Sequence, residues 1–214
     1  MQSSTAILDM PPETPSLRQQ AVLDAVLSLI VEGGDPLTMD AVARRASCSK
    51  ETLYKWFGDR DGLLTATVRW QASRVHAGRE PIDAIDAAVL RKELQNFAES
   101  WLAVIASPTS VALNRIAVAH AGSHKSNLGA IVLANGRFAI GERVKPVLEA
   151  GRAAGLLTFE DTEGAFRTFF GLVGRDIQIR LLLGDALDLD AAEIRSDAAR
   201  AVEQFLALYG QARP

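Results

Sequence analysis

Apolar side chains recur every three or four residues along most of the chain, which is the spacing of one face of an α-helix. The first run of this kind covers residues 16–32. It begins at Ser16, with Gln19 three residues later in the order of a capping box, and Gly33-Gly34 ends it. The pattern therefore predicts a first helix of four to five turns, preceded by a proline-containing arm over residues 1–15.

Three shorter helical runs follow the first one. The spacing predicts helices over 38–46 and 50–57, joined by the turn Ser47-Cys48-Ser49, and a fourth helix over 59–77. Each of the three begins at a Ser, Thr or Asp, or directly after one, and these side chains can accept a hydrogen bond from the first turn of a helix. Two short helices joined by a tight turn and packed on a longer one are typical of a helix-turn-helix.

The rest of the chain also follows the helical period, and no alternating pattern is long enough to predict a strand. We expect an all-α protein, with an N-terminal three-helix helix-turn-helix domain followed by a larger helical bundle that binds ligand and forms a dimer. The expected parts are an arm (1–15), a helix-turn-helix domain (16–58), a connecting helix (59–78) and the bundle (79–214). The helices expected in the bundle cover 82–106, 109–121, 125–135, 137–154, 161–183 and 190–209.

Charge is distributed unevenly. The whole chain has a net charge of −3, but between residues 44 and 60 five basic side chains stand against two acidic ones, which gives a local charge of +3. A local basic patch is sufficient for docking on phosphates, because salt screens charges that lie more than about 10 Å away. The composition therefore does not exclude a nucleic-acid partner.

The third short helix has two different faces. Leu53, Trp56 and Phe57 can pack on the first helix, and polar side chains remain on the other side. A helix that enters the major groove of DNA needs this division. The alternative is that the polar side is only a solvated helix face.

The string TMDAVARRASCSKETLYKWFGDRDGLL (38–64) resembles the signature of the tetracycline-repressor (TetR) family. The segment GRAAGLLTFEDTEGAFRTFFGLVGRDIQIRLLLG (151–184) is similar to the C-terminal domain of AefR-like members. Three departures stand out: Ser47 replaces the usual Gly of the turn, Glu51 replaces a frequent Gly, and Arg60-Asp61 replaces Lys-Glu. Positive φ is disfavoured for a residue such as Ser47.

The resemblance implies a set of DNA contacts. Thr38, Tyr54, Lys55 and the start of the fourth helix would hold phosphates, and residues 49–52 would face base edges. Lys50 would suit a guanine O6/N7 contact, and Glu51 would accept from a cytosine N4. The complete expected set is Thr38, Arg44, Ser47, Ser49, Lys50, Glu51, Thr52, Tyr54, Lys55 and Arg60.

The resemblance also implies an effector cavity among the C-terminal helices and a small, largely apolar effector that releases the DNA. Taken singly, each aromatic side chain fits the core better than a ligand contact, but together aromatic side chains often line such cavities. Polar anchors could come from Asn114, Arg115, Arg167 or Arg175, with surface ion pairs as the alternative. The expected effector residues are Phe97, Trp101, Asn114, Phe138, Phe166 and Phe170.

A symmetric dimer is expected because the family binds palindromic DNA, and the last two helices would form it. The glycines Gly164, Gly171 and Gly174 would then allow close helix approach. The apolar stripe expected at the interface consists of Phe170, Val173, Ile177, Leu181, Val202 and Phe205, accompanied by Phe166, Ile194 and Ala198.

Other function classes find little support. The sequence has no phosphate loop, nucleophile elbow or metal constellation, so an enzyme, a cofactor or a metal is not expected. His120 and His124 are four residues apart, but Gly122-Ser123 between them indicates a helix end. The single cysteine, Cys48, fits a reducing cytoplasm and a buried, inert thiol better than a redox switch. No signal peptide or membrane span is apparent, and a helical adaptor without DNA binding is the remaining alternative.

Overall fold

The computed structural model describes residues 15–33, 37–76, 85–121, 127–187 and 189–211. Within these ranges the chain is helical apart from connecting turns and one isolated bridge between Leu157 and Gly210. The all-α prediction is confirmed. The helices are α1 (Leu17–Glu32), α2 (Met39–Arg45), α3 (Lys50–Phe57), α4 (Arg60–Ala72), α5 (Ala87–Ala106), α6 (Pro108–Ala119), α7 (Leu128–Val132), the π-helical η2 (Leu133–Phe138), α8 (Ala139–Ala153), α9 (Thr162–Gly174), α10 (Ile177–Leu182) and α11 (Ala191–Tyr209).

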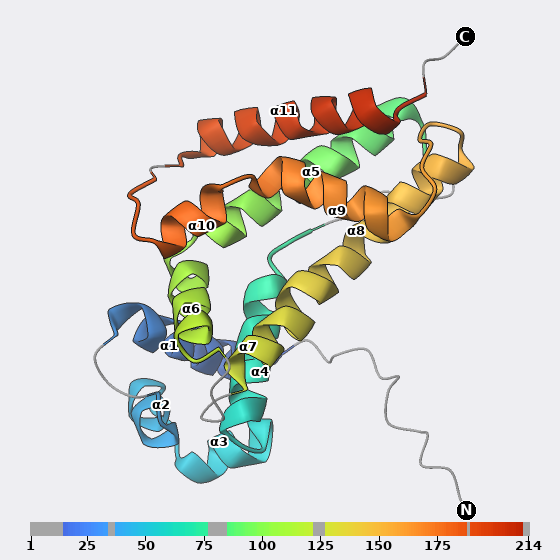
Figure 1. Ribbon diagram of the computed structural model, residues 1–214. Coiled ribbons are helices and arrows are strands. Elements are labelled where there is room, and N and C mark those ends of the chain that lie inside the picture. Colours follow the sequence, from blue (N-terminus) through green and yellow to red (C-terminus); the bar gives the residue numbers. More distant parts are fainter. Residues whose placement is uncertain (1–14, 34–36, 77–84, 122–126, 188, 212–214) are drawn as a thin grey trace, which may run out of the picture.

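The helices form two groups at opposite ends of the molecule. Figure 1 shows α1, α2 and α3 at one end, and α9, α10 and α11 at the other. Helix α4 rises from the first group, and α8 runs from its upper end towards the second. The expected division between the two parts, at residue 78, lies outside the described residues, as does most of the expected N-terminal arm.

The N-terminal group has a core of aliphatic side chains. Leu23 and Val26 of α1, Leu53 of α3 and Leu63 of α4 are all buried in one cluster. Helices α6 and α7 belong to the same cluster, because Leu113 and Leu128 are buried in it. The helix-turn-helix is therefore packed directly against elements that follow it by more than forty residues in sequence.

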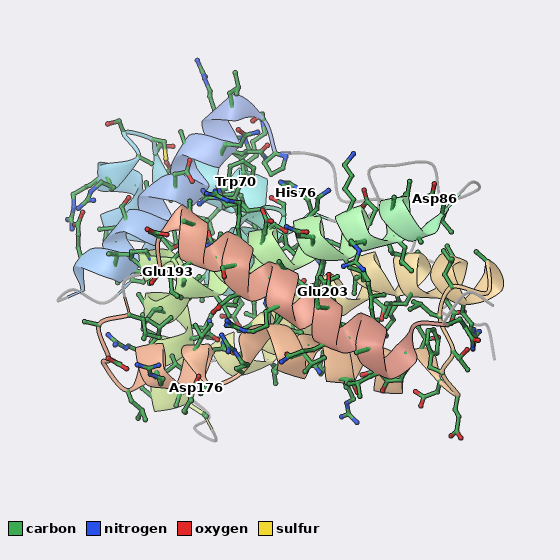
Figure 2. All side chains as sticks on the ribbon, turned by 90° about the horizontal axis from the view of Figure 1, so that it is seen from above. Trp70, His76, Asp86, Asp176, Glu193 and Glu203 are labelled. Carbon is green, nitrogen blue, oxygen red and sulfur yellow. The ribbon has the colours of Figure 1, made fainter. Side chains whose placement is uncertain are left out.

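The C-terminal group is built around aromatic side chains. Phe97 of α5 lies 5.9 Å from Phe169 of α9, and Phe169 lies 5.0 Å from Phe205 of α11, measured between ring centroids. All three rings are buried. Helix α11 thus packs on α5 and α9 of its own chain, as the red helix lying across the others in Figure 2 illustrates.

Three helix boundaries predicted from the sequence are wrong. Helix α4 ends at Ala72 instead of residue 77, because Arg143 of α8 donates hydrogen bonds to the carbonyls of Ala72 and Val75 and satisfies that end of the helix. The helix expected over 161–183 breaks after Gly174, where Arg175 has φ 40 and is held by an ion pair with Asp197 at 2.6 Å.

The third wrong boundary is the gap expected at residue 136. Helical structure continues there from α7 through η2 into α8. Gly136 sits within the π-helical segment, and the nearest atom to the position that its Cβ would take is Cγ1 of Val68, at 4.0 Å. A glycine in a helix lowers its stability without ending it, and η2 packs on α4 at this point.

Candidate nucleic-acid interface and internal cavity

Helices α2 and α3 begin at hydroxyl side chains that cap them. Thr38 accepts a hydrogen bond from the Ala41 N–H at 3.2 Å, and Ser49 accepts one from the Thr52 N–H at 3.2 Å. Leu53 is fully buried and fixes one side of α3 on the core. The opposite side of α3 is exposed, as a helix that reads the major groove requires.

The turn between α2 and α3 closes as a Schellman motif. The N–H of Cys48 donates to the Ala43 carbonyl at 3.0 Å, and the N–H of Ser47 donates to the Arg44 carbonyl at 3.3 Å. Ser47 takes the left-handed position of this motif, with φ 50. The sequence-based concern about Ser47 is therefore confirmed: a residue with a Cβ stands where glycine fits without strain.

Ser47→Gly should stabilise the helix-turn-helix by about 0.5–1 kcal/mol, because relief of the left-handed strain outweighs the entropy that a glycine loses on folding. Urea unfolding in the absence of DNA would measure this. Ser73→Gly is the matched control, because Ser73 ends α4 with φ −63 and should lose stability instead. A loss of stability in Ser47→Gly as well would contradict the strain argument.

Ion pairs within the protein engage several of the basic side chains around this motif. The ammonium of Lys50 lies 3.0 Å from the Asp40 carboxylate, and this hydrogen bond raises the pKa of Lys50. Arg45 forms an ion pair with Glu32 at 2.5 Å, and Arg60 donates to the Leu37 carbonyl at 3.1 Å. The ion pair therefore holds the Lys50 ammonium towards α2 in the free protein.

The other charged groups on this face are arranged differently. Hydrogen bonds from its own backbone N–H and from Ser49 lower the pKa of Glu51, which keeps it ionised at the start of α3. Within the described ranges, Arg44 and Lys55 form no ion pair, and both are exposed. Their charges are directly available to phosphates.

Near its C-terminal end, helix α4 forms side-chain hydrogen bonds to elements on two of its sides. The indole N–H of Trp70 donates to Asp24 of α1 at 2.8 Å, and Figure 2 shows Trp70 beside the blue α1 helix. Towards the other group, Arg69 donates to Asn135 of η2 at 2.7 Å. A shift of α4 would therefore disturb contacts on both sides.

A cavity of about 340 Å³ lies between α4 and the C-terminal helices. Val68, Gln71 and Ala72 of α4 form one wall, so the connecting helix itself borders the cavity. Trp101 and Phe170 lie on another wall, with their ring centroids 3.9 Å apart. The remaining polar lining comes from Ser110, Asn114, Arg137 and Gln178.

Gln71 is the most unusual residue of the lining. Its side chain is 5% exposed, its Nε2 donates to Ser107 Oγ at 3.0 Å, and its Oε1 is buried without a partner. A buried acceptor without a donor costs about 1–3 kcal/mol. Gln71 therefore places a buried polar group at the edge of a largely apolar wall.

Two family descriptions match the chain. Residues 22–67 match "Bacterial regulatory proteins, tetR family", and residues 92–211 match "AefR-like transcriptional repressor, C-terminal domain". The second match alone covers more than half of the chain. The chain belongs to the TetR family.

Solved structures and a curated relative agree. A TetR transcriptional regulator from Agrobacterium tumefaciens is 46% identical, with a TM-score of 0.78 over 92% of this chain and 96% of that one. The flavonoid-responsive regulator FrrA is 26% identical, with a TM-score of 0.66 over 92% and 98% of the two chains. HTH-type transcriptional regulator BetI of Burkholderia cenocepacia is 39% identical over 83 residues, which cover 34% of this chain and only 43% of the relative.

Within this TetR-family chain, the expected DNA-contact residues lie on α2 and α3, at the residues that flank these helices, and at the first residue of α4. All of them are exposed except Thr52, which is half-buried beside Ser49. That they touch DNA stays a prediction. Sequence reasoning missed the pairing of Lys50 with Asp40, which lies on α2 ten residues earlier in the chain and carries no signal of its own.

The expected effector residues divide into two groups. Trp101, Asn114 and Phe170 line the cavity. Phe97 and Phe166 do not, because both are buried in the aromatic core, and Phe138 is 55% exposed on η2. Three alternative anchors are engaged elsewhere: Arg115 donates to the Leu181 carbonyl, Arg175 pairs with Asp197, and Arg167 pairs with Glu163.

The structure places most of the expected dimer stripe inside the single chain. The side chains of Val173, Ile177, Leu181, Val202 and Phe205 are at most 8% exposed, so they have little surface left for a partner, and their part in a dimer stays a prediction. Phe170 is half-buried and contacts Trp101. Of the three glycines, Gly174 faces Trp101 and Gly164 faces Asp161, so both are explained by contacts inside the chain, whereas Gly171 borders open space.

The remaining sequence signals add no site. Within the described residues no three metal-ligating side chains lie together, and His124 lies outside these residues. His120 contacts the Ile116 carbonyl at 2.9 Å. Burial raises the pKa of the Cys48 thiol, which opposes formation of a reactive thiolate. In the described ranges no single helix is long and apolar enough to cross a membrane; only α5 and α6 taken together, with a 64° bend between them, reach that length and composition.

Proposed function

We propose that this regulator is a cytoplasmic, homodimeric repressor that binds a palindromic operator through α2 and α3. A small, largely apolar molecule would release the operator by occupying the cavity beside α4. The observation that carries the proposal is the position of α4, which borders the cavity with Val68, Gln71 and Ala72 and donates to Asp24 of the DNA-binding group through Trp70. The description of one structural neighbour as flavonoid-responsive supports a small-molecule effector.

Dimerisation is part of the proposal because two recognition helices must lie about 34–36 Å apart to enter successive major grooves. Exposed apolar side chains on the C-terminal group support an interface there: Ile179 and Leu183 at α10 and Leu208 on α11 are 54%, 81% and 64% exposed. Light scattering of the wild-type protein should give twice 23.0 kDa, and Leu183→Asp should shift the mass towards the 23.0 kDa of a single chain. A wild-type monomer at tens of micromolar would contradict the interface.

The function is tested by selecting bound sequences from random DNA with the wild-type protein. We expect a palindromic sequence that binds about a thousandfold or more tightly than random DNA at physiological salt. Failure to enrich any sequence would contradict the proposal. The selected operator also provides the substrate for the variants below.

Lys55→Ala and Lys50→Ala should separate positioning from reading. Lys55 has no partner within the described protein, so its loss should weaken all DNA about equally and reduce the salt slope by about one. Lys50→Ala should instead relax the preference at one operator position by roughly ten- to a hundredfold. Gel shifts on the operator and its single-base variants would measure both effects.

Asp40→Asn is the matched control for Lys50, because it removes the carboxylate that holds the ammonium away from a base. It should leave the base preference intact and raise operator affinity. An equal loss on operator and random DNA for Lys50→Ala would show that Lys50 is a phosphate contact, and no loss on either would show that it is a solvated residue; in both cases it reads no base.

A further inference from the structure

We propose that the cavity beside α4 takes a flat aromatic molecule of one or two rings, with an anionic oxygen group that meets Arg137 and a hydrogen-bond donor that meets Gln71. The inference rests on the proposed function, because it assigns a ligand class to the same cavity. Its support comes from the charge, the hydrogen bonds and the shape of the lining.

Arg137 supplies a positive charge at the cavity wall. Its guanidinium carbon lies 4.6 Å from the ring centroid of Phe170 and 5.3 Å from that of Phe166. Within the described residues it forms no ion pair, and Glu163 is engaged by Lys145 at 2.9 Å and Arg167 at 3.6 Å. The hydrogen bond from Lys145 is the main cause of the lowered pKa of Glu163, and the positive charge of Arg137 contributes to it, but no carboxylate among the described residues forms an ion pair with Arg137. Aromatic faces hold the guanidinium in place, and its planar edge remains for a carboxylate or another anionic oxygen group.

Gln71 supplies an acceptor, and its neighbours fix which end of the amide is free. Ser107 has one hydroxyl hydrogen, and its nearest acceptor is the Val104 carbonyl at 2.7 Å, ahead of Thr109 Oγ1 at 3.1 Å. Ser107 Oγ must therefore act as acceptor towards Gln71, which places Nε2 at Ser107 and leaves Oε1 unpartnered. A ligand hydroxyl or N–H is the group that satisfies a carbonyl oxygen.

The shape of the cavity favours rings. Trp101 and Phe170 pack against each other with a centroid distance of 3.9 Å and an angle of 31° between their planes, and together they form an aromatic wall. The volume of about 340 Å³ lies at the lower end of the range of ligand pockets, about 300–1,000 Å³. A planar system of one or two rings fills such a space and stacks on such a wall.

Isothermal titration calorimetry of the full-length chain with four probes tests the inference. The probes are hydroxynaphthoate, its methyl ester, naphthoate and decanoate, which remove the charge, the hydroxyl group and the rings in turn. We expect hydroxynaphthoate to bind roughly tenfold or more tightly than its ester, and roughly three- to tenfold more tightly than naphthoate. Decanoate should bind more weakly than either naphthoate.

Two variants assign each preference to its residue. Arg137→Gln should abolish the difference between the acid and its ester, while Arg167→Gln, which removes the same charge from the exposed side of α9, should keep it. Gln71→Met should abolish the preference for the hydroxyl group, while Gln95→Met, which alters a half-buried amide outside the cavity, should keep it. Unchanged operator affinity without probe would show that each variant is folded.

Equal binding of the acid and its ester to the wild-type protein would overturn the inference, as would an acid preference that survives Arg137→Gln. Decanoate binding as tightly as hydroxynaphthoate would overturn the aromatic assignment. These outcomes leave the operator selection untouched, so the inference can fail while the proposed function stands. If the protein binds hydroxynaphthoate selectively but no operator can be selected, the ligand class stands and the proposed function fails.

Discussion

Phe205→Ala is expected to lower the free energy of unfolding of the protomer by about 3–5 kcal/mol. The ring of Phe205 is fully buried, with the rings of Phe169 at 5.0 Å and Tyr209 at 4.9 Å. Removing it leaves a cavity between α11 and α9 that the surrounding helices can fill only in part. Because domains of this kind are stable by only about 5–15 kcal/mol, the loss is a large fraction of the total.

The measurement is chemical unfolding followed by circular dichroism. Leu17→Ala serves as the control, because this leucine of α1 is 83% exposed and should change the free energy of unfolding by less than about 0.5 kcal/mol. The result bears on how α11 is used. If Phe205→Ala is as stable as wild type but no longer dimeric, Phe205 is an interface residue and its burial within the chain is incorrect.

The same residue shows where sequence reasoning stops. The apolar stripe of residues 194–205 is real, and its spacing predicts a helix with one buried face. The spacing does not say whether that face meets the same chain or a second copy. The structure places α5 and α9 against it, and α5 lies about a hundred residues earlier in the chain.

Helix starts, in contrast, follow from short-range chemistry. Ser16, Thr38 and Ser49 each accept the hydrogen bond that their position predicts, because capping involves residues only two or three apart. The helix ends that were predicted wrongly depend on distant partners. Arg143 of α8 donates hydrogen bonds to carbonyls at the end of α4. Trp101 of α5 occupies the space beside Gly174, where α9 ends.

The cavity was predicted in part for the same reason. Aromatic residues on the C-terminal helices were the natural candidates, and Trp101 and Phe170 do line it. Sequence reasoning misses Gln71 as a cavity residue, because it assigns α4 only the role of connecting the helix-turn-helix domain to the bundle. Arg137 was missed because a single arginine in a helical run has no sequence signal that separates a cavity residue from a surface residue.

The largest expected effect on DNA binding comes from Gly62, a glycine in the first turn of α4 where this helix meets the end of α3. A Cβ at this position would overlap the carbonyl oxygen of Phe57 at the end of α3. The same carbonyl accepts a hydrogen bond from the Asp59 N–H at 3.1 Å, and Asp59 in turn caps α4 by accepting from the Gly62 N–H at 2.7 Å. The added Cβ would meet backbone atoms of Phe57, so rotation of a side chain cannot relieve the overlap.

Helix propensity alone predicts that Gly62→Ala stabilises α4 by up to about 1 kcal/mol. The contact with Phe57 predicts the opposite sign, because overpacking of a rigid site costs about 1–3 kcal/mol. Relief requires α3 to move away from α4, and α3 is the helix that we propose enters the major groove. If both protomers of a dimer must restore the angle between α3 and α4 in order to bind DNA, the free-energy cost of binding is about 2–6 kcal/mol. Operator affinity should then fall roughly 30-fold or more.

Gly129→Ala is the matched control for this prediction. Gly129 lies in α7, and the nearest atom to its would-be Cβ is the Ala117 carbonyl oxygen at an ordinary 3.9 Å. That variant should be neutral or slightly more stable and should bind the selected operator like wild type. Gel shifts and thermal unfolding of the two variants, side by side, decide between propensity and contact. A Gly62→Ala protein that is more stable than wild type and keeps its operator affinity would show that the junction between α3 and α4 yields easily, and that the angle between these helices is not what positions α3 for DNA.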